Sequence, residues 1–207
     1  MRVIEPSFKI LSFDDDAVKR ISRAARICYQ SNTKTDETAF IKRLIKTGHH
    51  TPLEMANATV EITCDRGISH ELVRHRLASF NQSSTRYCNY SKDKFSSEIT
   101  VIRPFFWDKN SHEYSLWAMA MDECERMYLT LIEGYKATPE QARSVLPNSL
   151  KTELIINCNF REWQHIFNLR CSKKSHPQMV QIMRPLLKEF YTRSPVIFED
   201  IYIKYQD

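Results

Sequence analysis

Residues 74–87 read Arg-His-Arg-Leu-Ala-Ser-Phe-Asn-Gln-Ser-Ser-Thr-Arg-Tyr and are dense in hydrogen-bond donors. They hold three arginines, one histidine and seven hydroxyl or amide side chains, with no acid and no lysine. A guanidinium is a rigid fork that fits the oxygens of a phosphate or a carboxylate. A basic polar surface loop is one interpretation of this stretch. Its density of donors favours a loop that wraps an anion such as a nucleotide phosphate.

The segments on either side of this stretch predict a scaffold for it. Apolar and polar residues alternate over residues 56–64, which predicts a half-buried strand. A turn at residues 65–67 is expected to lead into a helix that begins near Ser69. That helix is expected to place on one face Leu72, Val73, Arg76, Leu77 and Phe80. The polar run at residues 79–86 is then predicted to be a loop, where ligand-binding groups often lie.

The remaining patterns predict further strands and helices. Short strands are expected at residues 3–4, 9–13, 101–104 and 151–158. Helices are expected at residues 17–28, from 36 onward with Gly48 past its end, at 111–135, 138–146, from 160, and from 177 onward with an interruption or kink at Pro185. The apolar seam of the helix at 111–135 is predicted to pack in a core or between subunits and consists of Trp117, Met121, Cys124, Tyr128, Leu131 and Tyr135.

Length and composition limit the class of protein. A chain of 207 residues with 42% hydrophobic and 11% aromatic residues predicts one packed domain over residues 1–207. The net charge of +5 suggests an anionic ligand without requiring a polymer. Only three glycines are present, which excludes both G-x-G-x-x-G and Walker A loops. A dinucleotide would therefore be bound without a Rossmann turn.

The spacing of the cysteines and the length of the apolar runs predict the cellular compartment of the protein. The six cysteines contain no C-x-x-C pair, which argues against a zinc ribbon or a redox dithiol and favours reduced, mostly buried thiols. The longest apolar runs are far shorter than a membrane span, and residues 1–6 lack the apolar core of a signal peptide. The expected location is the cytoplasm.

A second group of donors lies in the C-terminal half. Asn159 is predicted to cap a helix, with Glu162 three residues later. Helical spacing places Arg161 and His165 on one face, with Arg170 a little over a turn beyond His165. A solvated basic helix face is the plain alternative.

These segments together resemble the flavin-dependent thymidylate synthases. Arg74-His75-Arg76 followed by Ser84 is similar to the family's signature, and the match continues through residues 83–87. Residues 48–54 resemble its G-H-x-T/S-P-x-E segment and residues 142–147 its A-R-x-x-L-P segment. With residues 159–178, the resemblance spans about residues 48 to 178, most of the chain.

The resemblance implies an α+β fold that is not Rossmann: one compact domain with a mixed or antiparallel sheet flanked by helices. It implies a methyltransferase that converts dUMP to dTMP. The carbon donor would be 5,10-methylenetetrahydrofolate, the reductant NADPH acting through FAD, and the released product tetrahydrofolate. A homotetramer with sites shared between subunits is implied too, without a nucleic-acid polymer, a membrane or a metal ion.

The family's site residues carry over by position. The FAD candidates are Thr51, Arg74, His75, Arg76, Gln82, Asn159, Arg161 and His165. The dUMP candidates are Glu71, Arg74, Gln82, Ser83, Ser84, Thr85, Arg86, Arg143 and Arg170. Relatives often carry glutamine where this chain has Glu71, and the spacing between Arg170 and His176 differs from some relatives. The roles of Glu71 and His176 therefore stay open.

The resemblance makes Arg170 the catalytic candidate. A guanidinium beside uracil O2 and N3 would favour the N3-deprotonated ring and enrich C5 in electron density. Ser84 is assigned to binding, because a serine hydroxyl without a relay is a poor nucleophile. No cysteine lies in the motifs, so no nucleophile of the enzyme is expected.

Two interpretations from other classes compete with this one. Arginines interleaved with Phe80, Tyr87 and Tyr90 could contact phosphates and stack bases in a nucleic-acid-binding module. Alternatively, a metal-dependent hydrolase could use His49, His50, Glu54 and His70. Steep salt-dependent polymer binding would support the first, and stoichiometric zinc or iron the second.

Overall fold

The strand predicted at residues 56–64 is present as β3 (Asn57–Asp65) in the computed structural model, which describes residues 1–31 and 36–206. Its inward side chains are buried, as the alternation predicts: Ala58, Val60, Ile62 and Cys64. β6 (Lys151–Asn159) shows the same pattern, with Leu154, Ile156 and Cys158 buried. Both sequence predictions are confirmed.

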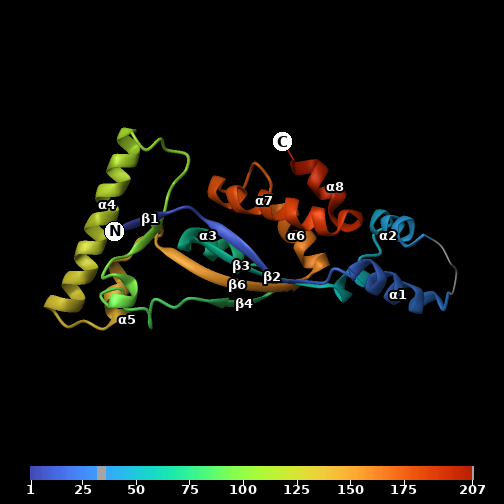
Figure 1. Ribbon diagram of the computed structural model, residues 1–207, viewed down its shortest axis with the longest axis horizontal. Helices are drawn as coiled ribbons and strands as arrows, with labels where there is room; N and C mark the ends of the chain where they lie inside the picture. The colour runs from blue at the N-terminus through green and yellow to red at the C-terminus, as the bar shows by residue number, and fades with distance from the viewer. Residues whose placement is uncertain (32–35, 207) are drawn as a thin grey trace. The chain divides into compact units, whose positions relative to one another are not determined.

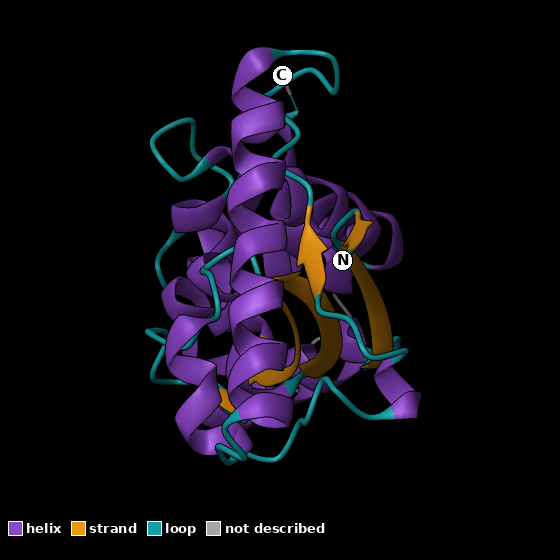
Figure 2. Ribbon diagram, turned by 90° about the vertical axis from the view of Figure 1, so that its left-hand side faces the viewer, coloured by secondary structure: helices purple, strands orange, loops and turns teal. Residues whose placement is uncertain are grey.

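β3 and β6 are the inner strands of a four-stranded sheet. Its order is β2–β3–β6–β4, with β2 at Ser7–Phe13 and β4 at Ser79–Gln82. Asn157 Nδ2 donates to Thr59 Oγ1, and the Arg66 amide donates to the Leu150 carbonyl. These pairings run in opposite directions along the two strands, so β3 and β6 are antiparallel. The predicted α+β fold with an antiparallel sheet and helices is confirmed (Figure 2).

The described chain divides into two compact units. The first unit contains residues 1–7, 62–74 and 81–154, and the second contains residues 8–61, 75–80 and 155–207. The single domain expected over residues 1–207 stays a prediction.

The second unit is mainly helical. Its helices are α1 (Ala17–Tyr29), α2 (Glu37–Lys46), the 3-10 turn η1 (Thr51–Met55), α6 (Phe160–Arg170), α7 (Pro177–Arg193) and α8 (Pro195–Tyr205) (Figure 1). α7 packs on α6 and α8. Fully buried aromatic rings join these three helices, with Trp163 and Phe167 stacked at 5.5 Å and Phe190 and Phe198 edge to face at 5.2 Å. Such ring pairs add stability beyond their buried area.

Local signals set the ends of these helices. The Asp36 carboxylate accepts from the Thr38 amide at the start of α2, and Gly48 adopts a φ of +77° just past its end. That φ lies in the left-handed region that glycine adopts without strain. Asn159 caps α6 by accepting from the Glu162 amide at 2.9 Å, as predicted. α7 continues through Pro185, so the helix is not interrupted there, and the alternative of a kink stays a prediction.

The first unit holds its own core. β1 (Arg2–Ile4) pairs in parallel with β5 (Thr100–Ile102). The helical segments of this unit are α3 (Arg66–Leu72), the 3-10 turn η2 (Asp93–Phe95), α4 (His112–Leu129), α5 (Pro139–Ala142) and the 3-10 turn η4 (Arg143–Val145). A π-helical turn, η3 (Thr130–Gly134), extends α4. Trp117 and Met121 of α4 pack against Ile99, Val101 and Leu150. The predicted core role is confirmed for these two residues and for the buried Tyr128, whereas Tyr135 is exposed.

The helix expected to begin near Ser69 is present as α3, but it begins earlier and does not extend to Phe80. The Asp65 carboxylate accepts from the Ile68 amide at 2.7 Å, which caps α3 before Arg66, and α3 ends at Leu72. Residues 79–82, predicted to be a loop, form β4 beside β6. Backbone pairing with β6 therefore overrides the helical spacing of the apolar residues.

Candidate functional site

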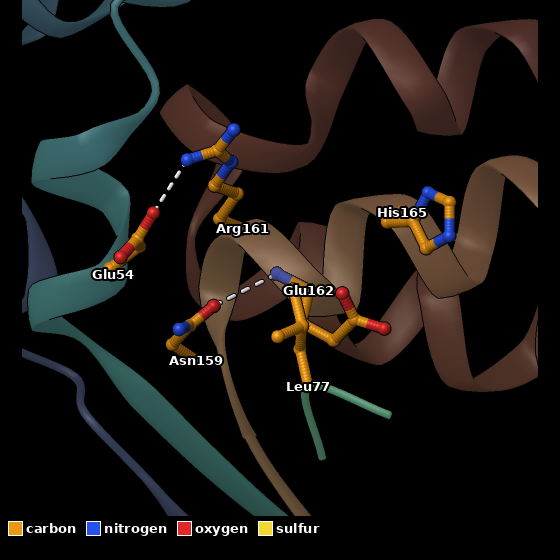
Figure 3. A pocket seen from close by; sticks show the side chains of 6 residues that line it. All are labelled: Glu54, Leu77, Asn159, Arg161, Glu162 and His165. Atoms are coloured by element: carbon orange, nitrogen blue, oxygen red, sulfur yellow. Dashed lines mark hydrogen bonds and ion pairs between the residues drawn. The ribbon is translucent and has the colours of Figure 1, made fainter. Parts of the chain in front are cut away.

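A cavity of about 400 Å³ in the second unit brings together three of the predicted FAD residues. Asn159 at the start of α6, and Arg161 and His165 on its first turns, line this cavity with Glu54, Leu77 and Glu162 (Figure 3). The spacing of four residues on one helix therefore places Arg161 and His165 at one cavity, as predicted. Its volume lies in the range of roughly 300–1,000 Å³ that is usual for small-molecule sites.

An ion pair lies at this cavity. Arg161 Nη1 donates to Glu54 Oε1 at 2.5 Å, and both side chains are partly exposed. Glu54 is held in place by η1, which packs against α6. Because the pair is open to solvent, the guanidinium can exchange this carboxylate for another anion at small cost. Figure 3 shows Arg161 and Glu54 facing each other beside Asn159.

Some side chains of the cavity could bind part of a flavin nucleotide. Arg161 offers a cationic fork for a pyrophosphate, and Asn159 and His165 add polar groups. Leu77 is 77% exposed and gives an apolar surface against which a ring could lie. The residues present therefore fit part of FAD, and they could hold its charged and ring portions.

His75 lies beside this cavity and is 5% exposed. Arg170 Nε donates to His75 Nε2 at 3.0 Å, and His75 Nδ1 lies 3.4 Å from Glu162 Oε1. The His165 ring meets the His75 ring edge to face at 5.7 Å. The sequence prediction placed His75 and Arg170 in one site, and the structure joins them directly.

The electrostatics of this cluster follow from burial. Loss of water, then the nearby Arg170 charge and then His165 together lower the pKa of His75 to about 4. Burial also raises the pKa of Glu162. The imidazole is therefore neutral at neutral pH, so its contact with Glu162 is not a salt bridge, although Nδ1 and Oε1 lie within ion-pair distance.

The stability of the protein should depend on this histidine. Unfolding restores the ordinary His75 pKa of 6.5, so between pH 6.5 and about 4 the unfolded chain takes up a proton that the folded chain refuses. The free energy of unfolding is therefore unaffected by His75 above pH 6.5 and decreases as the pH falls. The largest decrease is about 3 kcal/mol. Urea unfolding of the wild type and His75→Gln at pH 7.5 and 4.5 measures it. The wild type should lose more stability than the variant, and equal losses would contradict the assignment.

Among the residues that the structure describes, one group of three side chains has the atoms and spacing to hold a metal ion. Its possible ligand atoms lie within 4.8 Å of one another and belong to His75, Glu162 and His165. None of the four residues of the competing metal-hydrolase interpretation belongs to it. The Arg170 guanidinium already uses the His75 Nε2 lone pair and would repel a cation. The arrangement favours hydrogen bonding over metal ligation, and the expected absence of a metal stays a prediction.

The remaining FAD candidates lie elsewhere. Thr51 lines a second cavity of about 380 Å³, also in the second unit, together with Cys28, His49 and His50. Arg76 is exposed after His75. Arg74 and Gln82 belong to the first unit.

Most dUMP candidates lie in the first unit, and two of them share a buried anchor. Gln82 Nε2 donates to Thr152 Oγ1 at 3.0 Å and to Ser69 Oγ at 2.9 Å. The hydroxyls of Ser83 and Thr152 are hydrogen bonded at 3.0 Å. The Ser83 amide donates to the Glu153 carbonyl, and the Ser83 hydroxyl accepts from the Glu153 amide. Thr152 is fully buried. This network fixes the start of the polar loop against β6.

The rest of the loop forms a turn. The Ser84 hydroxyl accepts from the Arg86 amide at 3.3 Å, and the Ser84 carbonyl accepts from the Tyr87 and Cys88 amides. Thr85 is buried, while Arg86 is exposed and lies 3.5 Å from Glu140 of α5. Glu71 is half-buried on α3, and Arg74 and Arg143 are exposed.

Sequence reasoning missed three residues that shape these sites: Glu162 as a buried partner, Leu77 as a cavity wall and Thr152 as an anchor. A threonine at an inward position of the predicted strand at 151–158 was a usable signal, because a buried hydroxyl needs a partner. Glu162 carried no such signal, since its partner is 87 positions away along the chain, from 75 to 162. His176, left open before, caps α7 by accepting from the Gln178 amide.

The burial of the cysteine thiols determines whether they can act as nucleophiles. Burial raises the pKa of Cys171 to about 12 and also raises the pKa of Cys64 and Cys158. These three cysteines therefore stay protonated and are poor nucleophiles. Cys28 is exposed, so the expectation of mostly buried thiols holds for only half of the six.

Comparison with known proteins decides the family. Residues 9–196 match the model of the thymidylate synthase complementing protein family. The chain belongs to the flavin-dependent thymidylate synthases. It is 32% identical over 202 residues to the flavin-dependent thymidylate synthase of Geobacter sulfurreducens, covering 92% of this chain and 84% of that one. The enzyme of the same name from Corynebacterium aurimucosum is 31% identical over 87% of this chain and 78% of its own length.

A third relative gives the same family. The flavin-dependent thymidylate synthase of Pyrococcus furiosus is 31% identical over 169 residues, which is 81% of this chain and 68% of that one. The resemblance of residues 48–178 to this family is therefore confirmed and extends beyond that range. In the part of this flavin-dependent thymidylate synthase that the structure describes, no helix is both long and apolar enough to cross a membrane.

Proposed function

We propose that this chain converts dUMP to dTMP by reductive methylation, with 5,10-methylenetetrahydrofolate as carbon donor and NADPH as reductant, and releases tetrahydrofolate. The family match over residues 9–196 supports this proposal most strongly. FAD, when bound, would supply the hydride chemistry that no side chain can provide. The cytoplasmic location stays a prediction.

In this proposal the two units carry different tasks. The FAD candidates of the second unit are Thr51, His75, Arg76, Asn159, Arg161 and His165. The dUMP candidates of the first unit are Glu71, Arg74, Gln82, Ser83, Ser84, Thr85, Arg86 and Arg143. Arg74 and Gln82 are also proposed for FAD, and Arg170 of the second unit is proposed for dUMP. The donors of the first set suit a pyrophosphate, and those of the second suit a nucleotide phosphate.

The proposed role of Arg170 is to activate the uracil. Its Nε donates a hydrogen bond to His75 Nε2, and this contact orients the guanidinium. A fixed cation beside uracil O2 and N3 favours the N3-deprotonated ring, because the charge attracts the anion directly. That raises electron density at C5, the atom that must attack the one-carbon unit.

The proposal includes no nucleophile from the enzyme. The Ser84 hydroxyl accepts from a backbone amide within its own turn, which supports a binding role. The buried cysteines are held protonated.

The proposed assembly is a homotetramer with sites shared between subunits. Leu116 and Met119 of α4 are exposed at 54% and 68%, and they offer apolar surface for another chain. Light scattering that gave the mass of one 24.5 kDa chain would contradict this assembly.

The experiment that tests the function is a dTMP assay on the purified protein with each component omitted in turn. Product should require dUMP, 5,10-methylenetetrahydrofolate, FAD and NADPH together. Product that forms without FAD would refute the proposed chemistry.

Arg76→Ala should weaken FAD binding about tenfold or more, because a charge-assisted hydrogen bond contributes roughly 1.5–3 kcal/mol. Arg23 is an exposed arginine of α1, and Arg23→Ala removes the same charge as a control. Equilibrium dialysis against FAD measures both variants. Equal retention of FAD by Arg76→Ala and the control would remove Arg76 from the site.

A further inference from the structure

The buried pair of Glu162 and His75 carries an inference about how Arg170 is held. His75 is an FAD candidate by resemblance, but its two ring nitrogens already have partners within the protein. Nε2 accepts from Arg170 Nε at 3.0 Å, and Nδ1 lies 3.4 Å from Glu162 Oε1. Both side chains of the pair are almost completely buried, at 4% and 6% exposure.

These contacts require one particular tautomer. A neutral imidazole has one N–H and one lone pair. Because Arg170 is always a donor, Nε2 must carry the lone pair, and the proton must be on Nδ1, which faces the carboxylate. Both ring nitrogens are matched to their neighbours only in this tautomer, with the Nε2 lone pair toward Arg170 and the Nδ1–H toward Glu162.

We propose that Glu162 is a positioning residue that fixes the Arg170 guanidinium through the Nδ1–H tautomer of His75. In this proposal Glu162 accepts a hydrogen bond from Nδ1–H, and the Nε2 lone pair of His75 accepts from Arg170 Nε. The consequence for uracil rests on the proposed function of Arg170, whereas the tautomer is a property of this chain alone.

The contacts that run from Glu162 through His75 to Arg170 form a relay, and the position of Glu162 explains why this relay is stable. Its backbone amide is held by Asn159 at the first turn of α6, and Arg170 is the last residue of the same helix. One rigid helix therefore carries both ends of the relay, and His75 closes it from a distant part of the sequence. His165 and Arg170 are the other charged or titratable groups that act on His75.

Replacing Glu162 with leucine should break the relay. Leucine puts an apolar side chain in the buried position and cannot accept a hydrogen bond, so the Nδ1–H would be left unpaired. Moving the proton to Nε2 would set two donors, Nε2–H and Arg170 Nε–H, against each other, so the ring should instead lose its fixed orientation toward Arg170. Glutamine keeps an acceptor oxygen at the same place and should preserve the tautomer.

Solid-state NMR of protein labelled with 15N-histidine tests this directly, with the His75 signals assigned by their absence in His75→Gln. Wild type and Glu162→Gln should show a protonated Nδ1 and an unprotonated Nε2 at pH 7. Glu162→Leu should keep the proton on Nδ1 but shift its signal, because that N–H loses its acceptor. Glu199→Gln removes an acid of α8 that pairs with Lys42, and it should leave the signals unchanged.

Turnover supplies the second readout. Glu162→Leu should lower kcat about tenfold, Glu162→Gln should recover most of the loss, and FAD affinity should change less than kcat. An unchanged His75 signature in Glu162→Leu would overturn the inference, and so would a changed signature with wild-type kcat. If the wild type itself made no dTMP, the proposed function would fail while the NMR arm still decided the relay.

Discussion

Arg170→Ala should keep FAD bound while lowering dTMP formation about 10²–10³-fold, the usual loss when a fixed donor to a developing charge is removed. Arg170 does not line the 400 Å³ cavity with Arg161 and His165, so flavin retention should not depend on it. Its Nε bond to His75 gives it a fixed orientation that a flexible cation would lack. The measurements are the flavin absorbance of the purified variant and its rate of dTMP formation under saturating substrates.

Two controls sharpen this experiment. Arg23→Ala removes an exposed arginine and should be fully active. Arg170→Lys keeps the charge but loses the planar fork, and it should remain well below the wild type because lysine cannot reproduce the geometry. Wild-type turnover by Arg170→Ala would contradict the proposed role.

Trp163→Ala should destabilise the protein by about 3–5 kcal/mol, the typical cost of emptying a buried aromatic position. Trp163 is fully buried, stacks on Phe167 and packs against Phe190 at 4.9 Å. Its Nε1 also donates to the Ala58 carbonyl at 3.1 Å, so the variant leaves a buried acceptor without this partner. The free energy of unfolding in urea measures the loss.

Leu169→Ala is the matched control on the same helix. Leu169 is 48% exposed, so its truncation should change the free energy of unfolding by no more than about 0.5 kcal/mol. Similar losses from both variants would show that the aromatic cluster is not the main source of stability in α6.

The sequence predicted best where the cause of structure is local. Asn159 caps its helix as predicted, and the helices expected from residues 36 and 138 begin at an Asp36 cap and at a capping box of Thr138 with Gln141. Strands β3 and β6 followed from alternation. In each case a few neighbouring residues determine the outcome.

The errors arose where distant parts of the chain meet. Phe80 fits a helical face by spacing, but pairing with β6 draws residues 79–82 into the sheet. The prediction that Arg161 and His165 share a face needed only helical geometry and led to the cavity. The buried contact between Glu162 and His75 could not be inferred, because no pattern in either segment points to the other.

The measurement that tests the central claim most directly is an anaerobic visible spectrum of the purified protein reconstituted with FAD. Addition of NADPH and dUMP should bleach the flavin band. Addition of 5,10-methylenetetrahydrofolate should then restore the band as dTMP forms. A protein that binds no FAD, or a band that is restored without dTMP, would contradict the claim that this chain is a working flavin-dependent thymidylate synthase.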